Sequence, residues 1–271
     1  DGKLASGTLS GEDYATEYEN GVNAIVAELY GDIASSLLSS LPGEVSDALK
    51  EVGELDLYSL IVGSIFYKLA GLLLPIIYVI MASNNLIAGQ VDSGSMAYVL
   101  STSTKRRTVV FTQAVYLIGS LLAMFSLTTV TGCVCLAIVK ADSTSIIMSY
   151  GELILLNLGA FLVLFALSGL CFFTSCWFDR SKRSMAIGGG LSIYSLVGAM
   201  LGLFGTQTIP SVVRLDALNN FNYTTIISLF DSVSIIDGTL TFLWKFAILI
   251  VFGIVGYVIG ARKFVKKDLP L

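Results

Sequence analysis

The chain has 271 residues, of which 55% are hydrophobic and only 13% are charged. Its mean hydropathy is +0.80, and a soluble domain rarely combines these values. The net charge of −4 is unevenly spread, because residues 1–57 hold twelve acidic and two basic side chains, whereas the remainder holds eight acidic and fourteen basic ones. The composition therefore excludes an ordinary soluble protein and predicts a membrane protein with an acidic leading segment.

The acidic segment, residues 1–57, has its own helical pattern. Apolar residues recur every four positions from Ile25 to Leu37, which predicts an amphipathic helix over 23–38 and a second amphipathic piece over about 44–55. The first helix either packs on the outer ends of the membrane spans or acts as a substrate-facing lid. An acidic segment of this length does not cross a membrane unaided, so we expect a further transmembrane helix upstream, or a cleaved signal peptide.

Five apolar stretches follow, and each is long enough to cross a bilayer. A helix needs roughly 20 residues to cover about 30 Å of hydrocarbon. The predicted spans are 58–83, 109–139, 151–178, 187–205 and 241–261. We therefore expect an all-α, polytopic membrane helix bundle over 58–271, with five spans visible and a sixth, N-terminal one missing. Pro75 lies inside the first span and should kink it.

Basic residues predict the orientation of this bundle. They gather in loops two spans apart and at the C-terminus, as Lys105, Arg106 and Arg107, as Arg180, Lys182 and Arg183, and as Arg262, Lys263, Lys266 and Lys267. The positive-inside rule predicts that all three clusters lie in the cytoplasm. Residues 1–57 and the connections at 140–150 and 206–240 then lie outside. Because 206–240 is too interrupted to span, we expect short interfacial or re-entrant helices there.

Ionisable residues are scarce inside the predicted spans. Carriers driven by protons or sodium place Asp, Glu or His within the membrane, but these spans hold no Asp or His, and Glu152 lies at a span edge. Lys68 lies well inside a span, where a charged lysine costs about 2.5–3.5 kcal/mol near the midplane. Lys68 therefore either snorkels outward or faces a wet cavity. The pattern makes a secondary carrier the least favoured class.

The sequence also lacks the residues of several kinds of active site. It contains no histidine and no C-x-x-C pair, so zinc and haem sites are not expected. It has no P-loop motif, and Ser–His or Cys–His nucleophiles are impossible without histidine. We therefore predict no catalytic, cofactor-binding or metal-binding residue in this chain, and uphill transport would take its energy from another chain.

Two G-x-x-x-G patterns, Gly198–Gly202 and Gly256–Gly260, lie in the last two spans. Small residues at this spacing allow close approach of two membrane helices. The patterns predict either packing within the chain or a subunit interface.

The connection between the first two spans, residues 84–107, contains a second short amphipathic pattern. It predicts a helix that includes Met96, Tyr98 and Leu100, capped by Asp92 or Ser93. The segment is either an ordinary connecting loop or a docking element for a cytoplasmic partner.

The amino-acid sequence of this loop resembles that of a known family. Residues 90–107 read QVDSGSMAYVLSTSTKRR and run on into VVFTQA at 109–114. They are similar to the first cytoplasmic loop of ATP-binding-cassette (ABC) transporter permeases of the type-2 exporter class, above all those of Gram-positive bacteria. The segment IISLFD at 226–231 resembles the outer segment before the last helix in the same family, and KKDLPL at 266–271 is similar to the C-terminus of many of its members. The resemblance covers about residues 41–271.

The resemblance implies six helices, and so one helix missing upstream, in a bacterial cell membrane. It implies a coupling helix at about 90–100, in which Asp92, Ser93, Met96, Tyr98 and Leu100 contact an ATPase subunit. It also implies a second cytoplasmic loop at 179–184. The working unit would contain two ATPase subunits, which bind ATP and Mg, and a second permease, the same or different; no nucleic acid is involved.

The predicted function is that of a permease subunit, not itself an enzyme, in an ATP-driven exporter. It would couple ATP hydrolysis by separate subunits to export of an amphipathic, lipid-like or peptide cargo. The alternative is a membrane sensor or immunity subunit that captures a cationic peptide through the acidic outer segment.

Overall fold

The structure is a computed structural model that describes residues 59–142, 148–206 and 214–267. All of these residues belong to one compact unit. They form helices and connections without a strand, which confirms the all-α prediction. The helices predicted at 23–38 and 44–55, and the boundary at residue 57, lie outside the described residues.

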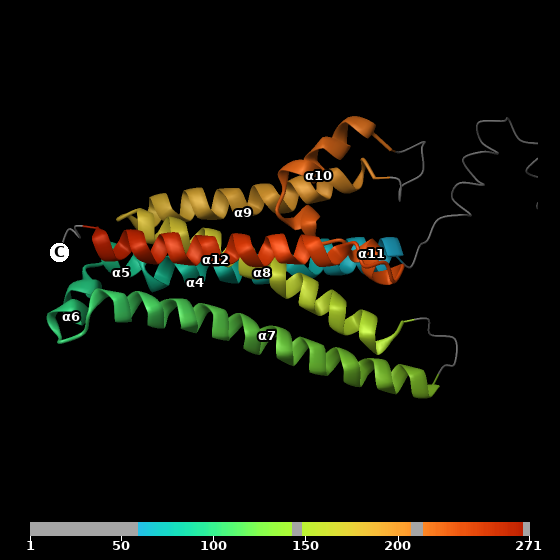
Figure 1. Cartoon of the computed structure of the whole chain (residues 1–271), viewed down its shortest axis with the longest axis horizontal. Helices are drawn as coiled ribbons and strands as arrows, with labels where there is room; N and C mark the ends of the chain where they lie inside the picture. The colour runs from blue at the N-terminus through green and yellow to red at the C-terminus, as the bar shows by residue number, and fades with distance from the viewer. Residues whose placement is uncertain (1–58, 143–147, 207–213, 268–271) are drawn as a thin grey trace, which may run out of the picture. The chain divides into compact units, whose positions relative to one another are not determined.

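The helical elements alternate long membrane-length helices with short connecting ones (Figure 1). In chain order they are η1 (Ser59–Ala70), α4 (Gly71–Leu86), α5 (Ala88–Asp92), α6 (Ser95–Ser101), α7 (Arg106–Asp142), α8 (Tyr150–Trp177), α9 (Ser181–Leu203), η2 (Asp216–Asn220), α10 (Phe221–Thr224), η3 (Ile227–Leu229), α11 (Ser232–Ile236) and α12 (Phe242–Lys266).

Five helices among the described residues are long and apolar enough to cross a membrane, as predicted. They cover Ser64–Leu86, Arg106–Ala141, Tyr150–Trp177, Ser181–Leu203 and Phe242–Lys266. Each overlaps one predicted span, but two boundaries differ from the prediction in a way that affects where charged residues lie. The first span begins at Ser64, so Lys68 lies near its end, and α12 continues to Lys266, so Arg262 and Lys263 lie on the helix itself.

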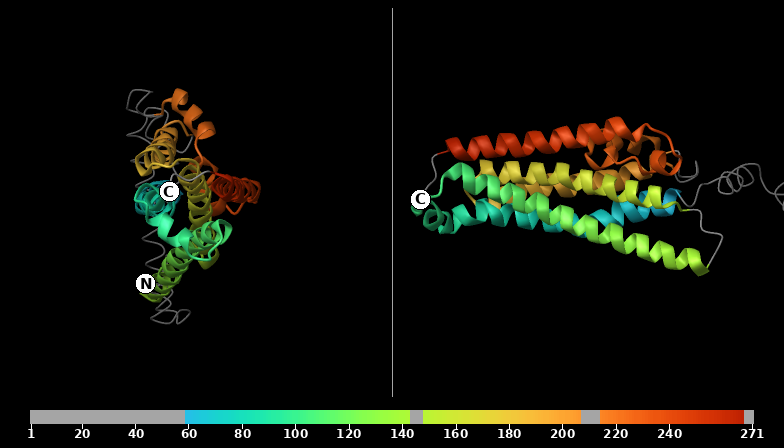
Figure 2. Two further views of the ribbon diagram at one scale, coloured as in Figure 1. Left: turned by 90° about the vertical axis from the view of Figure 1, so that its left-hand side faces the viewer. Right: turned by 60° about the horizontal axis from the view of Figure 1, so that its bottom comes forward.

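The central helix of the bundle is α8, which contacts α4, α7, α9 and α12 (Figure 2, left). It is the most buried of the five spans, whereas α7 is the least buried. Away from α6, α7 diverges from α4, α9 and α12 (Figure 1), while its far half stays in contact with the start of α8. Many of the side chains left exposed on α7 are apolar, such as Leu127 and Ile138. Apolar exposure of this kind suits contact with lipid, which is as apolar as leucine.

Glycines bring α8 and α12 into backbone contact. A Cβ atom on Gly169 of α8 would lie 2.6 Å from the carbonyl oxygen of Gly253, and one on Gly256 would lie 2.6 Å from the carbonyl oxygen of Gly169. In the other pattern, Gly198 and Gly202 of α9 face the side chains of residues 225 and 222. These glycines therefore pack against other parts of the same chain, one of the two readings that the sequence left open.

The first span changes helix type along its length. Residues of η1 form a π-helix, and the chain passes into the α-helix α4 at Gly71. Pro75 has no N–H group with which to bond the carbonyl of Gly71, four residues earlier. The π-helix ends at Ala70, one residue before the carbonyl that Pro75 leaves without its α-helical partner.

Short helices form the connection before α12, as expected for 206–240. The helices η2 and α10 pack on α9, while α11 packs on η1. At the same end of the bundle, Ser149 caps α8, and the carboxylate of Glu152 accepts a hydrogen bond from the Ser149 backbone N–H at 3.2 Å. Glu152, at the edge of its span, thus serves as part of a capping box.

Candidate functional site

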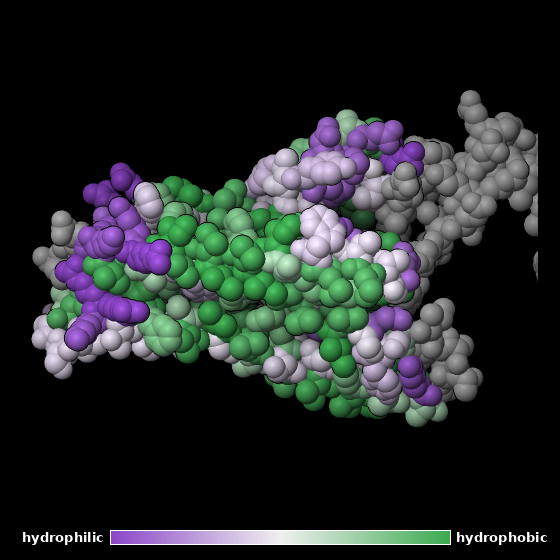
Figure 3. Space-filling model, viewed as in Figure 1, coloured by the Kyte–Doolittle hydropathy of each residue, from purple (hydrophilic) through white to green (hydrophobic). Residues whose placement is uncertain are grey.

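Most basic side chains of the described bundle lie at one end, called here the basic end. It carries α5, α6, the start of α7, the α8–α9 connection and the end of α12 (Figure 1). Figure 3 shows hydrophilic side chains at this end beside a broad hydrophobic belt. The three predicted clusters, Lys105–Arg107, Arg180–Arg183 and Arg262–Lys267, come together here. The side of the membrane that this end faces stays a prediction.

The short helix predicted in the 84–107 connection is present as α6. Gly94 precedes it with φ +74°, a left-handed conformation that glycine adopts without strain. The predicted capping residue is wrong, because Gly94, not Asp92 or Ser93, occupies the cap position and no side chain caps the helix. A glycine here lets the chain turn sharply from α5 into α6.

The two faces of α6 have opposite roles. Met96 is fully buried and belongs to an apolar cluster that also contains Val110 of α7 and Phe172 of α8. Tyr98 is 81% exposed, and Leu100 is half-buried. The helix is therefore anchored in the bundle by Met96 and presents a large aromatic side chain, of a type enriched at protein interfaces.

Three hydrogen bonds connect the α4–α5 region to α8 and α9. The Asp92 carboxylate accepts from the backbone N–H of Ser181 at 3.2 Å, and the Asn84 amide donates to the Ser181 hydroxyl at 2.7 Å. The backbone N–H of Ala88 donates to the hydroxyl of Ser175 at 3.0 Å. These bonds join the α4–α5 region to the end of α8 and the start of α9.

The remaining predicted residues of this end divide into linked and free groups. Ser93 shapes the turn, since its hydroxyl shares a 2.9 Å hydrogen bond with that of Ser95. Arg106 donates to the backbone carbonyl of Lys267 at 2.8 Å, which links α7 to the end of α12. The predicted basic anchors Lys105, Arg107, Arg180, Lys182 and Arg183 are exposed, and their side chains make no hydrogen bond or ion pair with the described residues.

Lys68 lies at the opposite end from these groups. Its side chain is half-buried, and its charged neighbours are Asp231 and Lys245. This position, beside an acidic group near the end of the span, supports snorkelling; a cavity-facing role stays a prediction. The Lys245 ammonium donates to the Asp231 carboxylate, an ion pair that joins α12 to the start of α11. Sequence reasoning missed this pair, because nothing local connects the two residues.

Asp231 is held in its charged form by its surroundings. Burial raises the pKa of this carboxyl, but hydrogen bonds from Lys245 and from the hydroxyl and backbone N–H of Ser234 outweigh burial, so its pKa lies below the ordinary 3.8.

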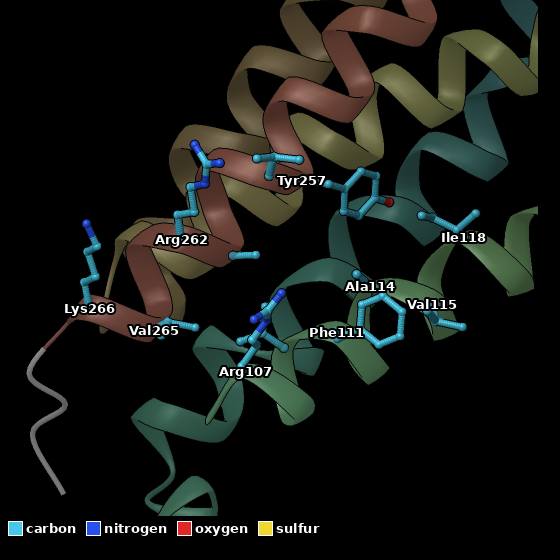
Figure 4. A pocket seen from close by; sticks show the side chains of 12 residues that line it. Arg107, Phe111, Ala114, Val115, Ile118, Tyr257, Arg262, Val265 and Lys266 are labelled. Carbon is cyan, nitrogen blue, oxygen red and sulfur yellow. The ribbon is translucent and has the colours of Figure 1, made fainter. Parts of the chain in front are cut away.

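A groove of about 680 Å³ opens between α7 and α12 near the basic end (Figure 4). Its walls are apolar, with Phe111 and Ile118 from α7 and Val258 from α12, while Arg107 and Arg262 are among its basic lining residues. Sequence reasoning missed the groove, although the spacing of its lining residues on each helix was visible.

Fold and basic end together define an all-α, multi-pass membrane protein with a short anchored helix beside three basic clusters. Residues 22–269 match the family described as ABC-2 family transporter protein, so the chain belongs to that family. The comparisons with curated proteins and with solved structures found no match. The chain is thus the membrane permease component of an ABC transporter and not its ATPase, and it associates with ABC ATPase subunits.

Proposed function

We propose that this permease drives export of an amphipathic, lipid-like or peptide cargo across a bacterial cell membrane, with the basic end in the cytoplasm. The positive-inside rule supports the orientation, since the three basic clusters share that end. The working unit holds two ATPase subunits, which bind ATP and Mg, and a second permease, the same or different.

The observation that best supports coupling between the ATPase and the membrane spans is that α6 is anchored in the bundle on one face and exposed on the other. Tyr98 projects from the bundle, while Met96 and the Asp92–Ser181 hydrogen bond fix α5 and α6 to the spans. In this proposal α5 and α6 are the coupling element, and Tyr98, Val99 and Leu100 meet the ATPase. Closure of the ATPase pair pushes this element, and the links to α8 and α9 shift these spans between two packings.

An apolar or amphipathic cargo follows from the scarcity of charge in the spans. In the described part of the bundle, the charged groups of the five spans lie near span ends, as Lys68 and Lys245 do. A strongly charged cargo would meet no counter-charge midway across the membrane. The expected measurement is ATPase activity of the reconstituted complex, which an amphipathic compound should stimulate; no stimulation by any such compound counts against this cargo class.

Replacement of Tyr98 by alanine tests the docking surface, and the chain offers a matched control. Tyr98 is 81% exposed at the basic end, and Tyr223 of α10 is 83% exposed at the opposite end. Tyr98→Ala should weaken association with the ATPase by about 2 kcal/mol, or roughly thirtyfold, if Tyr98 is an interface anchor. Tyr223→Ala should change nothing. Equal recovery of the ATPase with both variants in a quantitative pull-down would refute α6 as the contact.

The alternative function is a sensor or immunity subunit, favoured by the net charge of −10 in residues 1–57. A cationic peptide would bind there by charge complementarity. Deletion of residues 1–40 separates the two functions. Loss of peptide binding with ATPase coupling intact favours the sensor, whereas loss of cargo-stimulated ATPase activity favours the exporter.

A further inference from the structure

The groove between α7 and α12 is built from one face of each helix. On α7 its lining residues fall at 107, 110, 111, 114, 115 and 118, the three- and four-residue spacing of a single helical stripe. On α12 they fall at 257, 258, 261, 262, 265 and 266. The stripes are apolar except at the basic end, where Arg107, Arg262 and Lys266 lie (Figure 4).

These three cations have no protein partner among the described residues. Arg106 bonds to the backbone carbonyl of Lys267, and the Lys263 ammonium lies 4.7 Å from the centre of the Trp177 ring. By contrast, the side chains of Arg107, Arg262 and Lys266 make no hydrogen bond, ion pair or ring contact with the described residues. Arg106 and Lys263 are thus used within the fold. The three cations that line the groove are free, as are Lys105, Arg180, Lys182 and Arg183 outside it.

We infer that the groove binds one anionic phospholipid from the leaflet at the basic end. Arg107, Arg262 and Lys266 hold the headgroup phosphate, and an acyl chain lies along Phe111, Val115 and Ile118. Basic pockets between membrane helices have the chemistry that recognises anionic headgroups. The volume of about 680 Å³ falls within the range of ordinary ligand sites.

The distribution of charge and apolar surface favours a lipid over other occupants. A free phosphate would use the cations and leave an apolar wall, from Val110 to Ile118, exposed. A transmembrane helix of a second copy would cover the wall but bring the same Arg107 and Arg262 towards their own copies. A phospholipid matches both parts at once, with its charge at the membrane surface and its chain in the hydrocarbon.

Lipid retention by the full chain tests this site. The protein, in complex with its ATPase, is reconstituted into vesicles of equal parts phosphatidylglycerol and phosphatidylcholine. It is then extracted in mild detergent, and the lipid that remains bound is measured by native mass spectrometry. The wild type should retain phosphatidylglycerol in preference to phosphatidylcholine. The triple variant Arg107→Gln, Arg262→Gln, Lys266→Gln should lose this preference by about tenfold or more.

Two further variants separate a built site from general attraction to the basic end. Lys105→Gln, Lys182→Gln, Arg183→Gln removes the same charge at the same end but outside the groove lining, and should retain the lipid. Ala261→Phe keeps every charge and fills the groove, and should lose the lipid.

Three outcomes would overturn the inference. Equal loss of lipid in the two triple variants would mean surface attraction without a site. Retention of lipid by Ala261→Phe would place the lipid elsewhere. Efficient disulfide cross-linking between Val258→Cys copies would show a second copy in the groove. None of these outcomes bears on α6, so this inference and the proposed docking surface can fail separately.

Discussion

At the scale of single residues, the ion pair of Asp231 and Lys245 shows how a partly buried positive charge at the end of a span is neutralised by a carboxylate. Their side chains are 19% and 24% exposed, and Lys68 lies near enough to interact with both. One carboxylate therefore lies near two ammonium groups, at the opposite end of the bundle from α6. Loss of this carboxylate would leave two partly buried cations without compensation.

Asp231→Asn should destabilise the protein by about 1–2 kcal/mol, between the values typical of exposed and of buried ion pairs. The matched control is Asp216→Asn, since Asp216 pairs with Arg214 but is 85% exposed. Thermal unfolding in detergent should show a lower Tm for the first variant and an unchanged Tm for the second. Equal Tm values for both variants would mean that the Lys245 contact adds no stability.

The same pair gives a pH dependence with a definite sign. The folded-state pKa of Asp231 is lowered, so its contribution is complete well above the ordinary pKa of 3.8 and is lost as the pH falls through the lower folded-state value. The Tm difference between wild type and Asp231→Asn should therefore be constant near neutral pH and shrink only below about pH 4. A difference that changes between pH 6 and 8 would contradict this assignment.

At the scale of helices, the contact between α8 and α12 depends on the absence of side chains. Backbone atoms face each other at Gly169 and Gly253, so neither helix can yield by changing a rotamer. This contact sets how close α12 lies to the centre of the bundle.

Gly169→Ala should destabilise the protein by about 1–3 kcal/mol, since its Cβ would lie 2.6 Å from the Gly253 carbonyl oxygen. Gly119→Ala in α7 is the control, because no atom lies within 4 Å of the added Cβ there. That substitution should stabilise by up to about 1 kcal/mol, through the lower flexibility of alanine. Opposite shifts in Tm are the expected result, and a parallel decrease would contradict the role of the contact.

Much of the helix arrangement could be predicted from the sequence, but the packing could not. Hydropathy located five spans, and the loop pattern located the helix with Met96 and Tyr98. Helices in lipid are apolar on all sides, so composition does not indicate which face packs inward. For that reason the α7–α12 groove and the Asp231–Lys245 pair were missed. The cap at Gly94 was mispredicted, because a side chain that can cap does so only if the backbone turns suitably.

At the scale of the whole molecule, the fold makes the two ends chemically distinct, and their orientation is measurable. Ser101 at the end of α6 and Thr239 before α12 are both exposed and lie at opposite ends. In intact cells a membrane-impermeant maleimide should label Thr239→Cys and not Ser101→Cys, while both should react after lysis. Labelling of Ser101→Cys in intact cells would reverse the proposed orientation.

The placement of charge in the described spans also has an electrical consequence. Lys68 and Lys245 lie near one surface, and the basic end lies near the other. A charge that crosses the whole membrane exchanges about 2.3 kcal/mol per 100 mV with the transmembrane field. Rocking of these helices would carry almost no gating charge through that field. The basal ATPase rate of the complex should therefore be the same with and without a potential of about 100 mV across proteoliposomes. A steep dependence of the ATPase rate on voltage would mean that charges cross the field. An unchanged rate would mean that the transport cycle moves no net charge of the protein across the membrane.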